Sequence, residues 1–133
     1  MVRVTGILGL CGSGKSHRAH ELDPTGENTF DGIAGDSALR AQFFDHLHQG
    51  RDAIVEEVTY CDPVPRKQFE DDLAKIGAEI VWECFENDLD KANSNVRNRT
   101  NKGSVWEHLS YNERLTVIYV PPPDARMLDI YVI

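Results

Sequence analysis

The sequence predicts an α/β fold, a three-layer sandwich in which about five helices cover both faces of a five-stranded parallel sheet. Strand-like and helix-like segments alternate along the chain of 133 residues, at the spacing of βαβ units. The strand-like segments are short apolar runs, as in strands that are buried on both faces. A glycine-rich turn joins the first strand to the first helix. At this length we expect a single domain, residues 1–133.

The first part of the chain alternates strand, turn and helix. VRVTGIL, residues 2–8, predicts the first strand. The glycine-rich segment GLCGSGKS follows it and leads into a helix from about Lys15 to Leu22, which Asp23-Pro24 ends. NTFDGI, residues 28–33, predicts the second strand.

The middle of the chain contains two helices around a buried strand. Between Ser37 and Gln49 apolar residues recur at every fourth position, which is a helical period. They are Leu39, Phe43 and Leu47. DAIVEEV, residues 52–58, predicts the third strand. Asp62 as cap and Pro63 in the first turn begin the third helix, and Gly77 ends it.

The last part of the chain continues the alternation. AEIVWECF, residues 78–85, is the most apolar predicted strand. Asn87 is the expected cap of a fourth helix, and a break at Asn101–Gly103 separates it from a fifth helix at about Ser104–Thr116. A proline-rich connector then leads to MLDIYVI, residues 127–133, the predicted fifth strand.

The composition limits the partners and the setting. The formal net charge is −8, so no broad basic stripe is available for a nucleic-acid duplex, although a local basic pocket stays open. No apolar run has the length of a membrane span, and the N-terminus does not resemble a signal peptide, so no membrane partner is expected. The three cysteines form neither a disulfide framework nor a metal-type spacing, which favours a cytoplasmic protein.

The segment Gly9–Ser16 fits the P-loop (Walker A) pattern G-x-x-x-x-G-K-[ST]. Its glycines let backbone N–H groups fold around an anion, and the following helix points its positive end at the same place. In such a loop Lys15 reaches the β and γ phosphates of a nucleoside triphosphate such as ATP, and the Ser16 hydroxyl ligates Mg²⁺. The candidate nucleotide-binding residues are Gly9, Cys11, Gly12, Ser13, Gly14, Lys15, Ser16 and His17.

A P-loop site also needs a carboxylate that holds the metal, often through water. Glu56 and Glu57 lie at the end of the third predicted strand. Strand alternation puts their side chains on opposite faces, so only one can face the nucleotide easily. We favour Glu57 as the metal residue with Ser16, because it lies one step closer to the carboxyl edge of the sheet. The alternative is that both are solvated charges at a strand end.

Two aspartates are candidates for the acceptor side of a transfer site. A phosphotransferase needs a carboxylate that orients the acceptor hydroxyl or accepts its proton. Asp36 and Arg40 share one face of the second helix and could bind the acceptor together. Asp36 could equally cap that helix and form a surface ion pair with Arg40. Asp31, at the end of the second strand, is the rival carboxylate.

Two arginines near the end of the fourth helix are candidates for a mobile cationic lid. Arg97 and Arg99 precede Lys102 and a glycine hinge. Mobile cations can close over phosphates and neutralise the charge that develops in the transition state. On a continuous helix residues two apart point about 200° apart, so we expect only one arginine to serve a given phosphate. The alternative is a solvated helix end, where cations are favourable in any case.

GLCGSGKS, GDSALRA and the helix ENDLDKANSNVRNR together resemble small P-loop kinases of the adenylate-kinase-like and polynucleotide-kinase-like type, in particular short kinases of bacteriophages and bacteria. GDSALRA is similar to a G-D-x-x-R-A segment that grips the acceptor in nucleoside monophosphate kinases, with one extra residue before Arg40. EEVTYCDPVPR is similar to the D-T-N-L-N-x-x-x-R region of polynucleotide kinases, with Glu57 at the aspartate and Arg66 near the arginine.

This resemblance implies a P-loop NTPase fold with the strand order 2-3-1-4-5. It also implies transfer of the ATP γ-phosphate, with Mg²⁺, to a hydroxyl or phosphate of a small molecule or nucleotide. Two alternatives stay open: a nucleotide-binding switch or accessory protein with weak or no hydrolysis, and a kinase of nucleic-acid ends. The acceptor, the choice between ATP and GTP, and a homo-oligomeric state are left open by the sequence.

Overall fold

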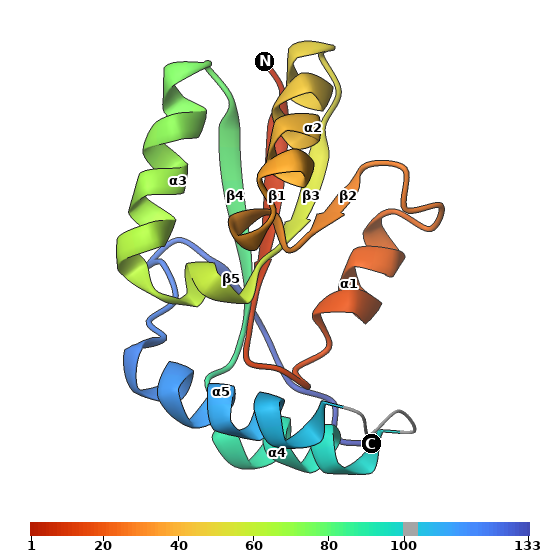
Figure 1. Ribbon diagram of the computed structural model, residues 1–133, viewed down its shortest axis with the longest axis vertical. Helices are drawn as coiled ribbons and strands as arrows, with labels where there is room; N and C mark the ends of the chain where they lie inside the picture. Colours follow the sequence, from red (N-terminus) through yellow and green to blue (C-terminus); the bar gives the residue numbers. More distant parts are fainter. Residues whose placement is uncertain (100–103) are drawn as a thin grey trace.

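A parallel β-sheet forms the centre of the molecule (Figure 1). The structure, a computed structural model, describes residues 1–99 and 104–133. Within these residues five strands pair in parallel in the order β2-β3-β1-β4-β5, which confirms the predicted parallel sheet and the strand order that the resemblance implied. The strands are β1 (Arg3–Leu8), β2 (Thr29–Asp31), β3 (Ala53–Glu56), β4 (Glu79–Phe85) and β5 (Arg126–Leu128).

Five α-helices and two short 3₁₀ helices connect these strands in the described part of the chain. They are α1 (Lys15–Leu22), η1 (Ile33–Gly35), α2 (Ser37–His48), η2 (Val58–Cys61), α3 (Pro63–Lys75), α4 (Leu89–Asn98) and α5 (Val105–Ile118). The bounds of α1 are those predicted, and α5 extends beyond the predicted end at Thr116. The predicted break at Asn101–Gly103 lies outside the described residues. No described helix combines the length and the apolar character needed to cross a bilayer.

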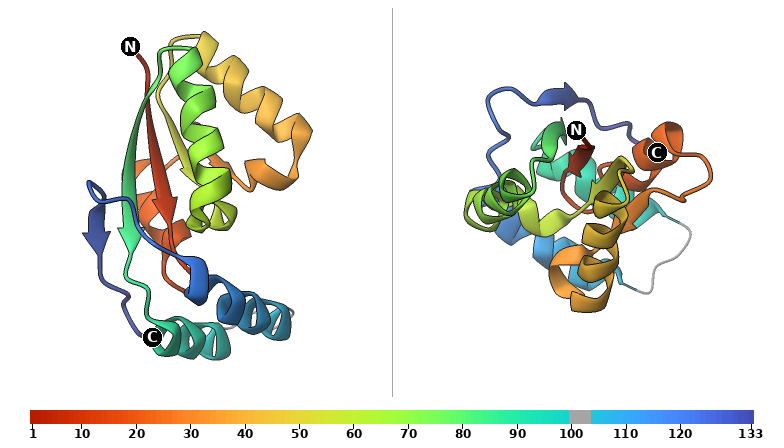
Figure 2. Two further views of the ribbon diagram at one scale, coloured as in Figure 1. Left: turned by 90° about the vertical axis from the view of Figure 1, so that its left-hand side faces the viewer. Right: turned by 90° about the horizontal axis from the view of Figure 1, so that it is seen from above.

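Helices lie on both faces of the sheet (Figure 2). Consecutive side chains of β4 point to opposite faces. Trp82 Nε1 donates to Glu70 of α3 at 3.0 Å, whereas Glu83 accepts from Arg18 of α1 at 2.6 Å. Therefore α3 and α1 cover opposite faces. On the α3 side, α2 packs beside α3, with the ring centroids of Phe43 (α2) and Phe69 (α3) 5.8 Å apart.

The face under α2 and α3 is closely packed, and this packing explains a glycine in the central strand. Gly6 of β1 is paired with Trp82 of β4, so both positions point to the same face. A Cβ atom at Gly6 would lie 2.2 Å from the Trp82 ring. The indole therefore occupies the space above Gly6, and any larger residue there would displace it.

The two remaining helices, α4 and α5, lie side by side across the carboxyl end of the sheet rather than on a face (Figures 1 and 2). A buried contact joins them: Asn112 Nδ2 of α5 donates to Asn93 Oδ1 of α4 at 3.0 Å. The three predicted layers are therefore unequal, with α2 and α3 on one face, α1 on the other, and the α4–α5 pair below the strand ends.

Asp88, and not Asn87, caps α4. The Asp88 carboxylate accepts from the backbone N–H of Lys91 at 3.0 Å, which is the N-cap geometry. The Asn87 amide instead binds α5: Nδ2 donates to the Thr116 carbonyl at 2.9 Å, and Oδ1 accepts from the Thr116 hydroxyl at 2.8 Å. The prediction of Asn87 as cap was wrong by one residue because this side chain ties two elements together.

The last strand is shorter than predicted. It ends at Leu128 instead of running to the C-terminus. The reason lies in α4: Asn95 Nδ2 donates to the Tyr131 carbonyl at 2.8 Å, and Asn95 Oδ1 accepts from the N–H of Ile133 at 2.8 Å. These backbone groups therefore bind a side chain of α4 rather than β4.

Candidate active site

The glycine-rich loop, Gly9–Ser16, joins the carboxyl end of β1 to the start of α1. Gly12 and Gly14 have φ values of 86° and 111°, a left-handed conformation that residues with a side chain rarely adopt. A Cβ atom at Gly12 would also lie 2.4 Å from the Ala92 carbonyl of α4. The conformation of the loop therefore requires these glycines.

The first turn of α1 offers unpaired donors to this loop. Gly14 is the N-cap, and neither it nor another described residue caps the helix with a side chain. The N–H groups of Lys15, Ser16 and His17 precede the first intrahelical hydrogen bond, which Arg18 donates to Gly14 at 3.0 Å. No acidic side chain lies in this turn. The start of α1 therefore presents several donors and a positive dipole end to the same small volume.

Ser13 adds a buried hydroxyl to the loop. The residue is 2% exposed, and its Oγ has no hydrogen-bond partner among the described residues. A Cβ atom at Gly9 would lie 2.3 Å from this oxygen, so only glycine fits there. A buried polar atom without a partner is costly, so the described part of the fold leaves the hydrogen-bonding capacity of this hydroxyl unused.

Lys15 turns back onto its own loop. Its ammonium donates to the carbonyls of Gly9 and Leu10, each at 3.0 Å. Within the described residues no carboxylate forms an ion pair with it. A phosphate would accept a stronger, charge-assisted hydrogen bond than these two neutral carbonyls.

Asparagines of α4 and α5 hold the loop from behind. Asn112 is fully buried and forms two hydrogen bonds with Cys11: its Oδ1 accepts from the N–H at 2.8 Å, and its Nδ2 donates to the carbonyl at 2.9 Å. Asn95 Nδ2 donates to the Gly12 carbonyl at 2.9 Å. The Cys11 main chain thus anchors the loop and does not face a ligand. The sequence reasoning missed both asparagines, since a polar residue on a helix carries no sequence signal that it is buried.

Glu56, not Glu57, lies beside the serine of the loop. The Ser16 hydroxyl donates to Glu56 Oε1 at 2.9 Å, and burial, the largest effect, raises the pKa of Glu56. Glu57 points to the other face, where its carboxylate accepts from the N–H groups of Ala34 at 2.8 Å and Thr59 at 3.1 Å. Of the two candidates, Glu56 and not the favoured Glu57 lies beside Ser16, because β3 ends at Glu56 and Glu57 begins the next turn as its cap; the metal role itself stays a prediction.

Asp31 lies next to Glu56, whereas Asp36 does not join this group. Asp31 pairs with Glu56 across β2 and β3, so both carboxylates point to the same face. Burial and then the charge of Glu57 raise the pKa of Asp31, while the nearby Lys15 ammonium lowers it. Asp36 is the N-cap of α2 and accepts from the Leu39 N–H at 3.0 Å. The structure brings together Lys15, Ser16, Asp31 and Glu56.

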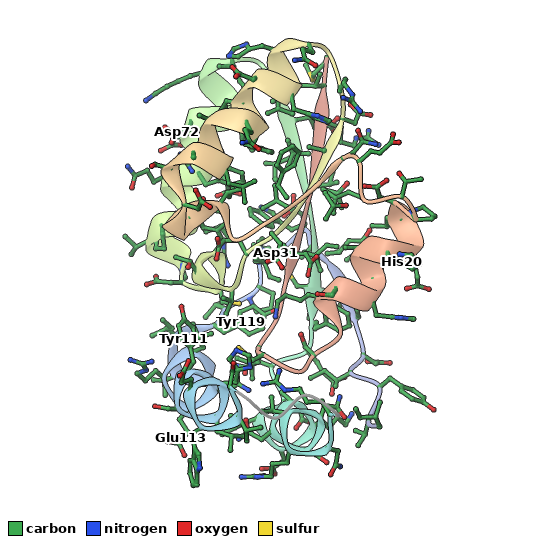
Figure 3. The ribbon with its side chains drawn as sticks, turned by 45° about the vertical axis from the view of Figure 1, so that its right-hand side comes forward. His20, Asp31, Asp72, Tyr111, Glu113 and Tyr119 are labelled. Atoms are coloured by element: carbon green, nitrogen blue, oxygen red, sulfur yellow. The ribbon has the colours of Figure 1, made fainter. Side chains whose placement is uncertain are left out.

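Arg40 is held away from this group. Its guanidinium pairs with Asp72 of α3 at 2.8 Å, donates to the Tyr60 hydroxyl at 3.2 Å and lies over the Phe44 ring at 5.2 Å. Figure 3 shows Asp72 on the outer helical layer and Asp31 near the middle of the molecule. Arg40 therefore ties α2 to α3, and the prediction that it meets the acceptor has no support in this arrangement.

The two arginines of the predicted lid differ in position. Arg97 lies exposed in the last turn of α4. Arg99 has left the helix, with φ −70° and ψ 155°, and its side chain lines a cavity. The helix ends at Asn98, so the two arginines do not lie on one continuous helix, and of the two only Arg99 lines the cavity; the lid role stays a prediction. Lys102 lies outside the described residues.

The cavity adjoins the glycine-rich loop and has a volume of about 760 Å³. Its wall includes Gly12–Gly14 and His17, and apolar side chains from β4 and the C-terminal segment face them. These are Phe85, Leu128, Tyr131 and Ile133. Asp31 and Glu56 do not line it. The loop therefore lies between an apolar cavity on one side and a group of carboxylates on the other.

Two oxygen donors of the site lie together and could hold a metal ion. No group of three or more His, Cys, Asp or Glu side chains is placed to hold a metal within residues 1–99 and 104–133. Magnesium binds through one or two protein oxygens together with substrate phosphates and water. The Ser16 hydroxyl and the Glu56 carboxylate are oxygen donors that meet this requirement.

No protein-family model and no curated protein matches this sequence.

Proposed function

We propose that the chain is a magnesium-dependent phosphotransferase that moves the γ-phosphoryl group of a nucleoside triphosphate, ATP in the first instance, to a hydroxyl or phosphate of a small molecule or nucleotide. One observation carries this proposal: the anion-binding loop lies between an apolar cavity and the carboxylates Asp31 and Glu56. A cavity of about 760 Å³ is large enough for a base and a ribose. A triphosphate that leaves this cavity along the loop would bring its last phosphate toward Lys15 and Asp31.

The residues of the site divide the work of transfer. The N–H groups of the first turn of α1 bind the phosphates, and the Lys15 ammonium stabilises the negative charge that develops on them in the transition state. The acceptor oxygen attacks the γ-phosphorus, the bond from this phosphorus to the β–γ bridging oxygen breaks, and the diphosphate leaves with the bonding electrons. For a hydroxyl acceptor, Asp31 takes the proton. Ser16 and Glu56 would hold magnesium, which neutralises phosphate charge when it is bound.

Acceptor-dependent ADP formation tests this function, and Asp31 provides the sharpest variant. We expect Asp31→Asn to reduce kcat by about 100-fold, because the amide cannot take the acceptor proton. Asp36→Asn is the matched control: asparagine caps a helix as well as aspartate does, so kcat should change by less than about twofold. The assay is run over a panel of sugars, nucleosides and nucleoside monophosphates.

The assay also separates the alternatives. Nucleotide binding without turnover in the presence of any acceptor would contradict the phosphotransferase and favour a switch protein. Turnover only with a 5′-hydroxyl oligonucleotide would favour a kinase of nucleic-acid ends. An equal loss of kcat in Asp31→Asn and Asp36→Asn would contradict the assignment of Asp31.

Glu56 should control the magnesium requirement. We expect Glu56→Gln to raise the magnesium concentration for half-maximal activity by about tenfold, because a neutral amide is a weaker ligand than a carboxylate. Glu57→Gln keeps a carbonyl oxygen for only one of its two backbone contacts and so is expected to cost stability, but it should leave this requirement unchanged because Glu57 does not contact Ser16. Magnesium titrations of the rate at fixed ATP measure both, and a larger effect in Glu57→Gln would reverse the assignment.

A further inference from the structure

Arg99 has an unusual environment for a cation that lines a cavity. The chain leaves α4 at this residue, and the guanidinium turns toward the wall that Gly12–Gly14 also form. Its Nε is buried and has no hydrogen-bond partner among the described residues. Its Nη2 contacts Nδ1 of His108. The contact with His108 therefore holds one end of the guanidinium.

His108 reaches Arg99 from a different helix. It lies in the first turns of α5. Its backbone N–H donates to the Ser104 carbonyl at 3.0 Å, so the helix backbone fixes the position of the residue. Burial, and then the positive charges of Arg99 and Lys15, lower the pKa of His108, while Glu107 raises it. The imidazole is therefore neutral at neutral pH. A neutral Nδ1 can accept the hydrogen bond that an always-protonated guanidinium donates.

We propose that His108 is a positioning residue: its imidazole accepts a hydrogen bond from Arg99 and holds this guanidinium where the cavity meets the glycine-rich loop, so that it contacts the phosphates as they pass from the cavity toward Lys15, the transferring phosphoryl group included. The inference rests on the proposed phosphotransferase function and names His108 as the residue that positions the Arg99 cation of that site. It also explains why α5 matters to a site whose other residues lie on the loop and the strand ends. Protonation of His108 would replace the acceptor with a donor and a like charge, and would release Arg99.

The affinity for a transition-state mimic tests this role without knowledge of the acceptor. The probe is Mg²⁺-ADP with aluminium fluoride, compared with Mg²⁺-ADP alone. We expect Arg99→Gln and His108→Ala each to weaken the aluminium fluoride complex by about tenfold, with little change for Mg²⁺-ADP. His108→Gln offers a carbonyl oxygen as a substitute acceptor and should stay within about threefold of the wild type. His20 is an exposed histidine on α1 (Figure 3), and His20→Gln is the control. Its affinities for both complexes should match those of the wild type.

A double-mutant cycle separates positioning from a general structural role. If His108 acts through Arg99, His108→Ala should have less than about a twofold effect in the Arg99→Gln background. NMR titration of the His108 ring gives a second readout that needs no His108 variant. In the nucleotide-free protein, Arg99→Gln should raise the His108 pKa, because it removes a nearby positive charge.

The outcomes distinguish the two proposals. If wild-type protein binds neither Mg²⁺-ADP nor its aluminium fluoride complex, the proposed function fails. If it binds both, but the effects of His108→Ala and Arg99→Gln multiply, or the His108 pKa is the same in Arg99→Gln, then the positioning role is overturned and the proposed function stands.

Discussion

Lys15→Ala is expected to reduce phosphoryl transfer by roughly 1000-fold while the protein stays folded. The Lys15 ammonium contacts only the carbonyls of Gly9 and Leu10 of its own loop among the described residues, so its removal breaks no ion pair of the fold. It does remove the cation nearest to the phosphates, and a positioned cation of this kind is worth several kcal/mol in the transition state. Steady-state ADP formation gives the rate, and thermal unfolding gives the stability.

Lys67→Ala is the matched control for this prediction. Lys67 lies on α3, and its ion pair with Asp71 is solvent-exposed, so its loss should leave both the stability and the rate unchanged. If Lys15→Ala kept more than a tenth of the wild-type rate, the loop would not hold the reacting phosphates. An unfolded Lys15→Ala protein would instead show that the two carbonyl contacts support the fold.

Asn112→Ala is expected to lower the free energy of unfolding by about 3 kcal/mol. This fully buried side chain satisfies both main-chain groups of Cys11 and also bonds Asn93 of α4. Alanine would leave the Cys11 N–H and carbonyl buried without partners and would open a cavity. Because the same contacts fix the glycine-rich loop, the affinity for Mg²⁺-ATP should fall as well. Urea denaturation measures the stability, and calorimetric titration measures the affinity.

Asn98→Ala is the control for this variant. Asn98 is exposed at the end of α4, and its hydrogen bonds to Ser94 and Ile133 are long, at 3.5 and 3.4 Å. We expect a change in stability within about 0.5 kcal/mol. The anchoring role of Asn112 would be contradicted if both variants were equally stable, or if Asn112→Ala lost stability but bound Mg²⁺-ATP as tightly as the wild type.

Short sequence patterns were sufficient to predict the turns, the helix ends and the type of sheet, because these depend on residues close together in the chain. The pattern of Gly9–Ser16 predicted the turn between β1 and α1, because Gly12 and Gly14 need conformations that only glycine adopts easily. Asp23-Pro24 predicted the end of α1 for a similar local reason. The alternation of strands and helices predicted a parallel sheet, since such connections favour βαβ units.

The features that the sequence did not predict depend on contacts between segments far apart in the chain. The choice between Glu56 and Glu57 depends on where β3 ends: Glu56 is its last residue, and Glu57 contacts Ala34 instead of the loop. The early end of β5 depends on Asn95 of α4. Asp31 became the better candidate for the acceptor only because β2 pairs with β3. The contact of Arg99 with His108 joins the residue that follows α4 to α5, and no sequence period marks it.

NMR titration of ¹⁵N-labelled wild-type protein with a non-hydrolysable ATP analogue and Mg²⁺ tests most directly whether the start of α1 is an anion site. Saturable binding is predicted, with the largest amide shifts at Lys15, Ser16 and His17, whose N–H groups lie free at the start of α1. The same titration without magnesium should give weaker binding at the same amides. An absence of shifts in these three signals, or saturable binding that moves only residues outside the glycine-rich loop, would contradict this account.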